Sequence, residues 1–245
     1  MFQIKICGVT RPEDALAAVT AGADAIGLNF YPQSVRFVGQ EQARRIAAAV
    51  PAGVVRVGVF VNATADEILQ TFDRTPLDLI QLHGDEPPEF LRLLGGRPLI
   101  RVFRVEKGVG SLCFGAATGT AETRGTKTPA PFFLEYLDRC RQLGAVPRLV
   151  LADAAAGRAY GGTGELADWS ALAGYPAADW HPPLILAGGL TPDNVADAIR
   201  TVRPAGVDTA SGVESRPGYK DAERMKRFVE TARAALARDQ RRRPC

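Results

Sequence analysis

One buried strand is followed by an aspartate and a glycine-rich loop, which together could perform acid chemistry on an anionic ligand. The apolar run Leu149–Asp153 places a carboxyl group at its end, and the loop Tyr160–Gly164 follows a few residues later. Glycines such as Gly162 and Gly164 leave backbone N–H groups unobstructed, so this loop can approach a phosphate closely. The helix signal at Asp168–Trp169 adds a positive dipole end nearby. These residues predict a site for a phosphorylated small molecule beside an acid.

Two later loops repeat the glycine signal. Gly188 and Gly189 follow one apolar run, and Ser211 and Gly212 follow the next. The loops after the last two strands of a barrel commonly bind phosphate through backbone N–H groups and a helix N-terminus. A single Gly-Gly pair is more often a plain turn, whereas two such loops after consecutive strands favour a phosphate site.

The elements that must position these residues alternate regularly between strand and helix. Strand-like apolar runs lie at Gln3–Cys7, Ala25–Phe30, Val54–Phe60, Leu77–Leu82, Leu99–Val105, Leu149–Asp153, Leu184–Ala187 and Val207–Ser211. Helical signals lie at Arg11–Thr20, Gln40–Val50, Ala65–Asp73, Pro88–Leu94, Phe133–Leu143, Pro192–Val202 and Tyr219–Ala237. This pattern predicts an α/β fold, a single-domain (β/α)₈ TIM barrel over residues 1–237. The alternative is a doubly wound open sheet, whose first strand usually leads into Gly-x-Gly-x-x-Gly, a motif that does not follow Cys7.

Two segments fall outside this alternation. Residues 106–131 are rich in Gly, Thr and Ala without a clear period, and they form an irregular insertion after the fifth strand. A lid over the site and a tolerated surface insertion are both compatible with this composition. Residues 238–245 contain four Arg and one Asp, which accounts for the whole net charge of +3. We expect a disordered basic tail and no nucleic-acid binding, because no basic face accompanies it.

Composition narrows the cellular setting. The chain has 245 residues, 46% of them hydrophobic, which is enough for one sizeable core. It has no apolar run long enough to span a bilayer and no secretory signal pattern. Its four cysteines lack paired short spacings, so we expect free thiols, no metal site and no disulfide framework. The sequence therefore predicts a cytoplasmic protein without membrane contact, as a monomer or a homodimer.

Several single residues at strand ends have two interpretations. Cys7 ends the first strand and is either a small buried hydrophobe or a base. Asp153 and Asp208 are residue types common at helix caps and in loops, as well as in active sites. Arg36 is either a solvated surface residue or a residue whose guanidinium group binds a planar carboxylate through two parallel hydrogen bonds. Histidine is a residue type suited to acid or base catalysis near neutral pH, but we interpret His83 as a structural or pocket-lining residue.

With these residues in these positions, the chain resembles the phosphoribosylanthranilate isomerase family of tryptophan biosynthesis. The resemblance extends from Lys5 to about Asp221 and omits only the insertion. The matching motifs are Lys5-Ile-Cys-Gly-Val-Thr10, Phe30-Tyr-Pro-Gln-Ser-Val-Arg36, Val57-Gly-Val-Phe-Val-Asn62, Gln81-Leu-His-Gly84, Leu151-Ala-Asp153, Gly161-Gly-Thr-Gly164, Asp168-Trp169, Ala187-Gly-Gly-Leu190 and Val207-Asp-Thr-Ala-Ser-Gly-Val-Glu214.

The resemblance implies an Amadori rearrangement of N-(5-phosphoribosyl)anthranilate to 1-(2-carboxyphenylamino)-1-deoxyribulose 5-phosphate, the third step from chorismate to tryptophan. It implies no cofactor. It assigns Asp153 as general acid, Cys7 as general base and Asp208 as a supporting polar contact. Arg36 becomes the partner of the anthranilate carboxylate. An acid of this kind needs a raised pKa, and a cysteine base needs thiolate character, which Lys5 or another cation could promote.

The sequence departs from the family pattern at two positions of the phosphate site. Glu165-Leu-Ala stands where the family commonly has Lys-Thr-Phe, so a cation near the phosphate is lost. Ala210 replaces one serine before Ser211 but keeps the backbone donors. Two alternatives carry the same glycine loops: another phosphate-binding TIM-barrel enzyme of the superfamily, and a non-catalytic phosphosugar-binding protein. The second of these would not need the pair Cys7 and Asp153.

Overall fold

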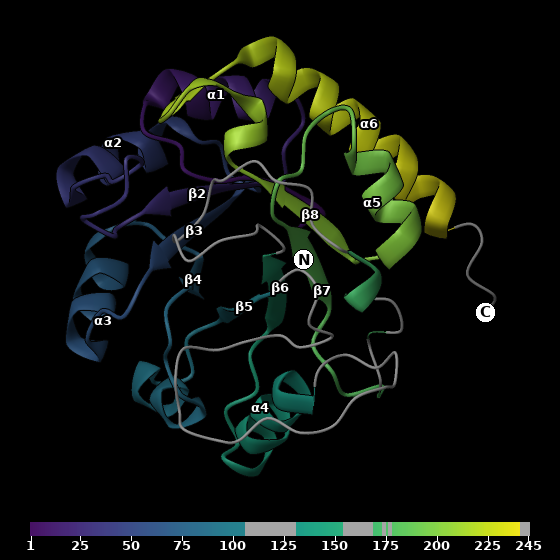
Figure 1. The fold of residues 1–245 in the computed structure, drawn as a ribbon. Helices are drawn as coiled ribbons and strands as arrows, with labels where there is room; N and C mark the ends of the chain where they lie inside the picture. Colours follow the sequence, from purple (N-terminus) through teal and green to yellow (C-terminus); the bar gives the residue numbers. More distant parts are fainter. Residues whose placement is uncertain (106–130, 154–168, 173–174, 176–177, 241–245) are drawn as a thin grey trace.

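Eight parallel strands, joined in chain order, close into a barrel in this computed structural model, which describes residues 1–105, 131–153, 169–172, 175 and 178–240 (Figure 1). The strands are β1 (Ile4–Ile6), β2 (Ala25–Asn29), β3 (Val55–Phe60), β4 (Leu79–Leu82), β5 (Leu99–Arg104), β6 (Leu149–Asp153), β7 (Leu184–Ala187) and β8 (Gly206–Thr209). The α-helices are α1 (Pro12–Thr20), α2 (Gln40–Ala49), α3 (Ala65–Arg74), α4 (Pro131–Gln142), α5 (Val195–Val202) and α6 (Ala222–Gln240). The predicted (β/α)₈ barrel is confirmed.

The barrel closes between its first and last strands. Lys5 of β1 is in register with Ala25 of β2 on one side and with Asp208 of β8 on the other. Alternate residues of a strand point to opposite faces, so Lys5 points into the barrel while Ile4 and Ile6 point outward. Both isoleucines belong to the core between the strands and the helices.

The molecule has two hydrophobic cores. The larger one fills the space between the barrel and its helices. The smaller one fills the barrel interior, where it contains Phe2, Val57, Ile100, Leu151 and Ile185. The barrel is therefore a packed platform, and polar side chains occupy its interior only toward the carboxyl ends of the strands.

Three of the short elements differ from the sequence prediction. Pro88–Leu94 is a 3₁₀ helix, η1, which ends at Gly95 in the left-handed region. Trp169–Leu172 is also a 3₁₀ helix, η2. The predicted helix Tyr219–Ala237 begins later, because Tyr219–Lys220 forms strand β10, which pairs antiparallel with β9 (Glu214–Arg216) through a turn at Gly218 with φ 81°.

Where a helix start has a strong capping signal, the sequence predicted it well. Helix α3 begins after Thr64, whose hydroxyl accepts a hydrogen bond from the Glu67 backbone N–H. The Glu67 carboxylate accepts one in return from the Thr64 N–H at 2.9 Å. This reciprocal pair satisfies two of the donors that a helix start leaves open.

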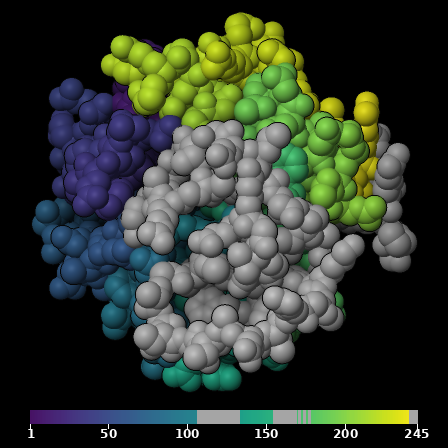
Figure 2. All heavy atoms as spheres, in the orientation of Figure 1, coloured from purple at the N-terminus to yellow at the C-terminus, as the bar shows by residue number. Residues whose placement is uncertain are grey.

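The last helix of the chain packs on the outside of the barrel (Figure 1). Helix α6, yellow in Figures 1 and 2, packs against α1 and α5. It runs to Gln240, so the first three residues assigned to the basic tail are helical. Residues 241–245 and residues 106–130 of the insertion lie outside the described residues, and Pro131 is the first residue of α4. Within the described chain, none of the helices has the length and apolarity that crossing a membrane requires.

Candidate active site

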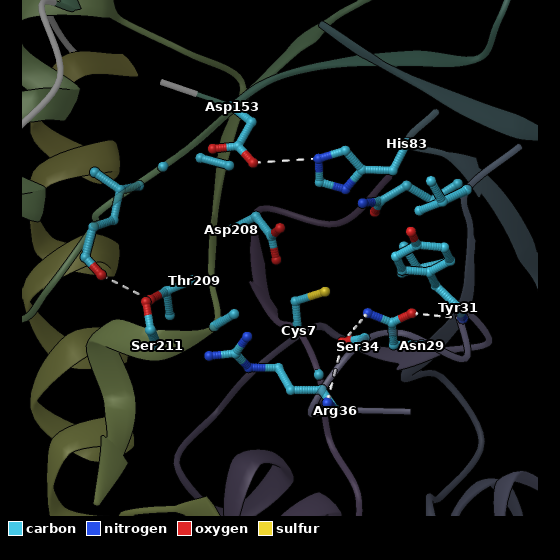
Figure 3. A pocket seen from close by; sticks show the side chains of 18 of the residues that line it. Cys7, Asn29, Tyr31, Ser34, Arg36, His83, Asp153, Asp208, Thr209 and Ser211 are labelled. Carbon is cyan, nitrogen blue, oxygen red and sulfur yellow. Dashed lines mark hydrogen bonds and ion pairs between the residues drawn. The ribbon is translucent and has the colours of Figure 1, made fainter. Parts of the chain in front are cut away.

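A pocket lies at the carboxyl ends of the strands and collects most of the predicted site residues (Figure 3). Its lining residues come from β1 to β4 and β6 to β8 and from the loops that follow them. They are Cys7, Gly8, Asn29, Tyr31, Ser34, Arg36, Val59, Val61, Gln81, His83, Asp153, Ala187, Gly188, Gly189, Leu190, Asp208, Thr209, Ala210 and Ser211. Cys7 and Asp153, predicted from separate runs 146 positions apart, therefore face one cavity.

Cys7 lies directly after β1 and beside a buried ion pair. Its backbone N–H donates to the Thr209 carbonyl at 2.8 Å, which ties the residue to β8. Two positions earlier, Lys5 is fully buried, and its Nζ lies 3.0 Å from Asp208 Oδ1. Lys5 also interacts electrostatically with Cys7. The thiol, the ammonium and the carboxylate thus form one chain of contacts.

Burial and these contacts together raise the pKa of both Cys7 and Lys5. Burial raises the pKa of the Cys7 thiol above its usual value, and although Lys5 lowers it, the net shift is upward. Burial alone would lower the pKa of Lys5, but the Asp208 carboxylate and Cys7 outweigh it, so this pKa is raised and the ammonium stays charged. In the ligand-free protein Cys7 is therefore mainly a thiol, contrary to the thiolate character expected from sequence.

A glycine on the neighbouring strand leaves room for this arrangement. A Cβ atom on Gly27 of β2 would lie 2.7 Å from Cys7 Sγ and 3.2 Å from Lys5 Cε. Real Cβ contacts are longer than the first of these distances, so any larger residue would displace the sulfur.

Arg36 lies in the loop after β2 and is held by a residue that the sequence analysis did not single out. Its Nε and Nη2 atoms each donate to the Glu214 carboxylate at 2.7 Å. Lys220 shares this carboxylate, with its Nζ 2.9 Å from Glu214 Oε1 and 2.9 Å from the Ala210 carbonyl oxygen. Burial would raise the pKa of Glu214, but the two cations outweigh it and lower this pKa. The guanidinium edge expected to meet a substrate carboxylate is therefore occupied by Glu214, and Nη1 is the nitrogen that Glu214 leaves unused.

On the opposite wall Asp153 is in contact with His83. His83 Nε2 lies 3.3 Å from Asp153 Oδ2, and both side chains are mostly buried (Figure 3). The His83 backbone N–H donates to the Phe60 carbonyl at 2.8 Å, and the His83 carbonyl accepts from Arg104 Nη2 at 3.3 Å. His83 therefore lines the pocket as predicted, and its backbone is fixed by the neighbouring strands.

A second buried ion pair supports the loop that carries His83. Arg101 of β5 is fully buried, and its Nη1 donates to Glu86 Oε2 at 3.0 Å. The same guanidinium donates to the carbonyls of Leu82 and Gly84 at 3.1 and 3.2 Å. Glu86 in turn accepts from the Gly84 backbone N–H at 3.1 Å. These bonds fix the loop between β4 and η1.

The predicted phosphate loops are only partly within the described residues. Gly188 and Gly189 line the pocket with φ of 90° and 64°, a left-handed conformation that favours glycine. Ser211 lines the pocket beside them, and Gly212 packs so closely against the Leu190 carbonyl that no side chain would fit. Gly162 and Gly164, and the substituted position Glu165, lie outside the described residues.

One pocket-lining side chain has an open polar atom. Gln81 is 1% exposed, and its Oε1 has no hydrogen-bond partner among the described residues. Buried acceptors are almost always paired, so this atom is suited to receive a donor from a ligand. In the same part of the chain, no group of three or more His, Cys, Asp or Glu side chains could hold a metal ion.

The residues that the sequence analysis missed are those that act through distant partners. Glu214 belongs to a matching motif but has no local signal that pairs it with Arg36, 178 positions earlier. Lys220 was assigned to a helix, which hid its role beside Glu214. Lys5 was named only as a cation that could promote the Cys7 thiolate, and its contact with Asp208 spans 203 positions.

Comparison with known proteins identifies the family. The model of a family described as N-(5'phosphoribosyl)anthranilate (PRA) isomerase matches residues 4–123 and 130–231. An N-(5'-phosphoribosyl)anthranilate isomerase of Geobacter sulfurreducens is 44% identical over 233 residues, which cover 95% of this chain and 99% of the relative. One from Myxococcus xanthus is 43% identical, covering 95% and 96%.

Solved structures agree with this result. A phosphoribosyl anthranilate isomerase of Thermotoga maritima has 36% identity and a TM-score of 0.74, covering 96% of this chain and 100% of its own. A structure in complex with reduced 1-(o-carboxyphenylamino)-1-deoxyribulose 5-phosphate has the same identity and coverage, with a TM-score of 0.71. With relatives this similar along nearly their whole length, and with the matching motifs gathered around one pocket, this chain belongs to the N-(5'-phosphoribosyl)anthranilate isomerase family.

Proposed function

We propose that this protein catalyses the Amadori rearrangement of N-(5-phosphoribosyl)anthranilate, with Asp153 as general acid and Cys7 as general base. The observation that carries this assignment is the position of the two side chains, which face one pocket from β6 and from the end of β1 (Figure 3). No cofactor takes part in the proposed reaction.

In the first step Asp153 donates its proton to the ribose ring oxygen. The bond between this oxygen and C1 breaks, and the electron pair of the substrate nitrogen forms a C1=N iminium ion. In the second step the Cys7 thiolate removes the proton from C2, the C–H electron pair becomes the C1=C2 bond of an enolamine, and the C1=N π pair returns to nitrogen and neutralises it. This enolamine tautomerises to the ketone, and proton exchange with water restores both side chains.

The iminium ion offers a reason why a thiol of raised pKa can serve as the base. Cys7 is mainly protonated in the ligand-free site because it is buried. A positive charge on the substrate, one bond from C2, favours the thiolate in the complex, since an opposite charge nearby lowers the pKa of an acid. Lys5 acts in the same direction.

The anionic ends of the substrate have complementary groups in the pocket. Arg36, through the part of its guanidinium not used by Glu214, is the partner proposed for the anthranilate carboxylate. Gly188, Gly189 and Ser211, with Gly212 behind them, are proposed to hold the phosphate through backbone N–H groups, together with Gly162 and Gly164. Asp208 lines the same pocket and offers an acceptor to the substrate.

The reduced thiol that this mechanism requires at Cys7 supports a cytoplasmic location, where cysteines stay free. The substrate is a small phosphosugar, and neither a nucleic acid nor a membrane takes part.

A steady-state assay tests the proposal. Phosphoribosylanthranilate is generated in situ and its fluorescence is followed with the wild type, Cys7→Ser and Asp153→Asn. We expect turnover by the wild type and a fall in kcat of at least about a hundredfold in each variant, as is typical for losing a general acid or base. Cys140→Ala and Asp197→Asn serve as matched controls, because Cys140 is buried behind the barrel wall and Asp197 is exposed on α5.

Two results would contradict the proposal. A folded wild type without turnover would leave one of the two alternatives, another phosphate-binding barrel enzyme or a phosphosugar-binding protein. Full activity in either site variant would remove that residue from its proposed role.

A further inference from the structure

We infer that Lys5 is the charge partner of the Cys7 thiolate and that Asp208 positions the Lys5 ammonium for this task. Lys5 is thus a charge-stabilising residue that acts on the substrate only through Cys7. The inference rests on the proposed function, because it concerns the base of that reaction.

The geometry places three groups in sequence along one face of the barrel interior. Lys5 and Cys7 are two positions apart, so their side chains leave the chain in the same direction. Lys5 Nζ lies 3.0 Å from Asp208 Oδ1, and Lys5 Cε and Cys7 Sγ lie beside the same position of Gly27. An ammonium group carries three N–H donors, so Lys5 can serve both partners at once.

Burial makes this arrangement more than an ordinary surface pair. Lys5 is 0% exposed and Asp208 6% exposed, so both charges are removed from water. A buried ammonium must be paired to remain charged, and Asp208 provides that pairing. Lys5 therefore keeps its positive charge whether Cys7 is a thiol or a thiolate.

Two other cations near Cys7 share the carboxylate of Glu214. Arg36 donates twice to Glu214, and Lys220 donates to Glu214 and to the Ala210 carbonyl. Both cations interact electrostatically with Cys7, but of the charged groups facing the sulfur from β1, β8, β10 and the loop after β2, Lys5 lowers the pKa of the thiol most. Asp153 and His83 lie on the opposite wall.

Gly27 provides the space that the contact requires. Its missing side chain leaves a gap that Cys7 Sγ and Lys5 Cε share, at 2.7 and 3.2 Å from where a Cβ would lie. The neighbouring strand is thus built to admit both side chains, which supports a function for their contact.

The charge balance of the step is simple. The Cys7 S–H bond breaks, its proton passes to solvent and the electron pair stays on sulfur. Lys5 keeps all of its protons, so the chain of Asp208, Lys5 and Cys7 goes from net charge 0 to −1. The thiolate then takes the C2 proton and the chain returns to 0.

The test measures the ionisation of Cys7 directly. Iodoacetamide reacts with thiolates. The alkylation rate of the peptide that contains Cys7 is followed by mass spectrometry from pH 6 to 11. The pH at which this rate is half of its maximum is the midpoint of thiol ionisation. The variants are Lys5→Met, which removes the charge at similar length, and the double variant Lys5→Met with Asp208→Asn. The double variant also removes the carboxylate that the single change leaves buried and unpaired.

We expect the midpoint to rise by about one to three pH units in Lys5→Met, the range for losing an opposite charge at contact distance. The double variant should rise less, because Asp208 no longer opposes the thiolate. In both, the profile of kcat/KM against pH should move in parallel. Cys140, buried and with a pKa of about 12, is an internal control whose reactivity increases only if the fold opens.

The outcomes separate this inference from the proposed function. A Cys7 midpoint that stays at the wild-type value in both variants overturns the role of Lys5, even if the enzyme is active. A raised midpoint in a protein that does not turn over phosphoribosylanthranilate supports the charge pairing and overturns the isomerase proposal.

Discussion

The two walls of the pocket hold their ionisable groups in different surroundings. Around Cys7, the ion pairs of Lys5 with Asp208 and of Arg36 with Glu214 bring buried charges of both signs close together. Around Asp153, one contact is with His83, and Arg104 of the adjacent strand contacts the His83 carbonyl and Asp85. A base that becomes an anion gains from nearby cations, and the Cys7 wall supplies them from its two ion pairs.

Arg101→Met would break the support behind the Asp153 wall and should have the largest effect. It leaves Glu86 buried without its partner, and breaking such a pair costs about 3–5 kcal/mol of unfolding free energy. Urea denaturation followed by circular dichroism measures the loss. Arg97→Met, which removes a partly exposed pair with Asp73, is the matched control and should cost under about 1 kcal/mol. Equal losses in the two variants would show that burial does not distinguish these pairs.

Gly27→Ala would disturb the Cys7 wall without changing any charge. The new Cβ displaces the sulfur, and a misplacement of about 1 Å at a reacting group can reduce kcat about a hundredfold. Steady-state kinetics measures this, with Gly39→Ala as control because that position has no atom within 4 Å of an added Cβ. A normal kcat would mean that the sulfur does not need this position.

Arg36→Lys would sharpen the distinction between binding and chemistry on the same wall. Lysine keeps the charge but cannot bridge Glu214 and a carboxylate with fixed geometry, so KM should rise about tenfold while kcat changes little. Initial rates over a range of substrate concentrations separate the two constants. A fall in kcat at constant KM would instead assign Arg36 to the chemical step.

His83→Asn should have the smallest effect. It removes one contact to Asp153, worth about two- to tenfold in kcat if that contact orients the carboxyl group. The comparison is with Asp153→Asn, measured in the same assay. If both variants lose activity equally, His83 is itself a proton carrier, and the Asp153 wall depends on a pair of ionisable groups.

Most of the barrel could be predicted because buried parallel strands are continuous apolar runs. Leu149–Asp153 and Leu184–Ala187 were predicted to the residue for this reason. The predicted start of α3 at Ala65 is also confirmed. The prediction of a helix at Tyr219–Lys220 was wrong, because a two-residue strand has no period and is recognised only through its pairing with β9.

Of the site, only residues that line the pocket were predictable from the sequence. Residues at strand ends, such as Cys7 and Asp153, follow from the barrel geometry. The residues behind them do not, because Glu214 meets Arg36 and Asp208 meets Lys5 only when the barrel closes. Charge partners this far apart in the chain leave no local pattern.

Barrel closure also determines when the pocket can form during synthesis of the chain on the ribosome. Lys5 and Arg36 are synthesised at the start of the chain, whereas Asp208, Glu214 and Lys220 emerge near its end. Until then the two early cations lack their counter-charges, and burying them is unfavourable. The Cys7 half of the pocket can therefore be completed only after translation has passed residue 220, and a nascent or truncated chain carries the thiol without the charges that tune it.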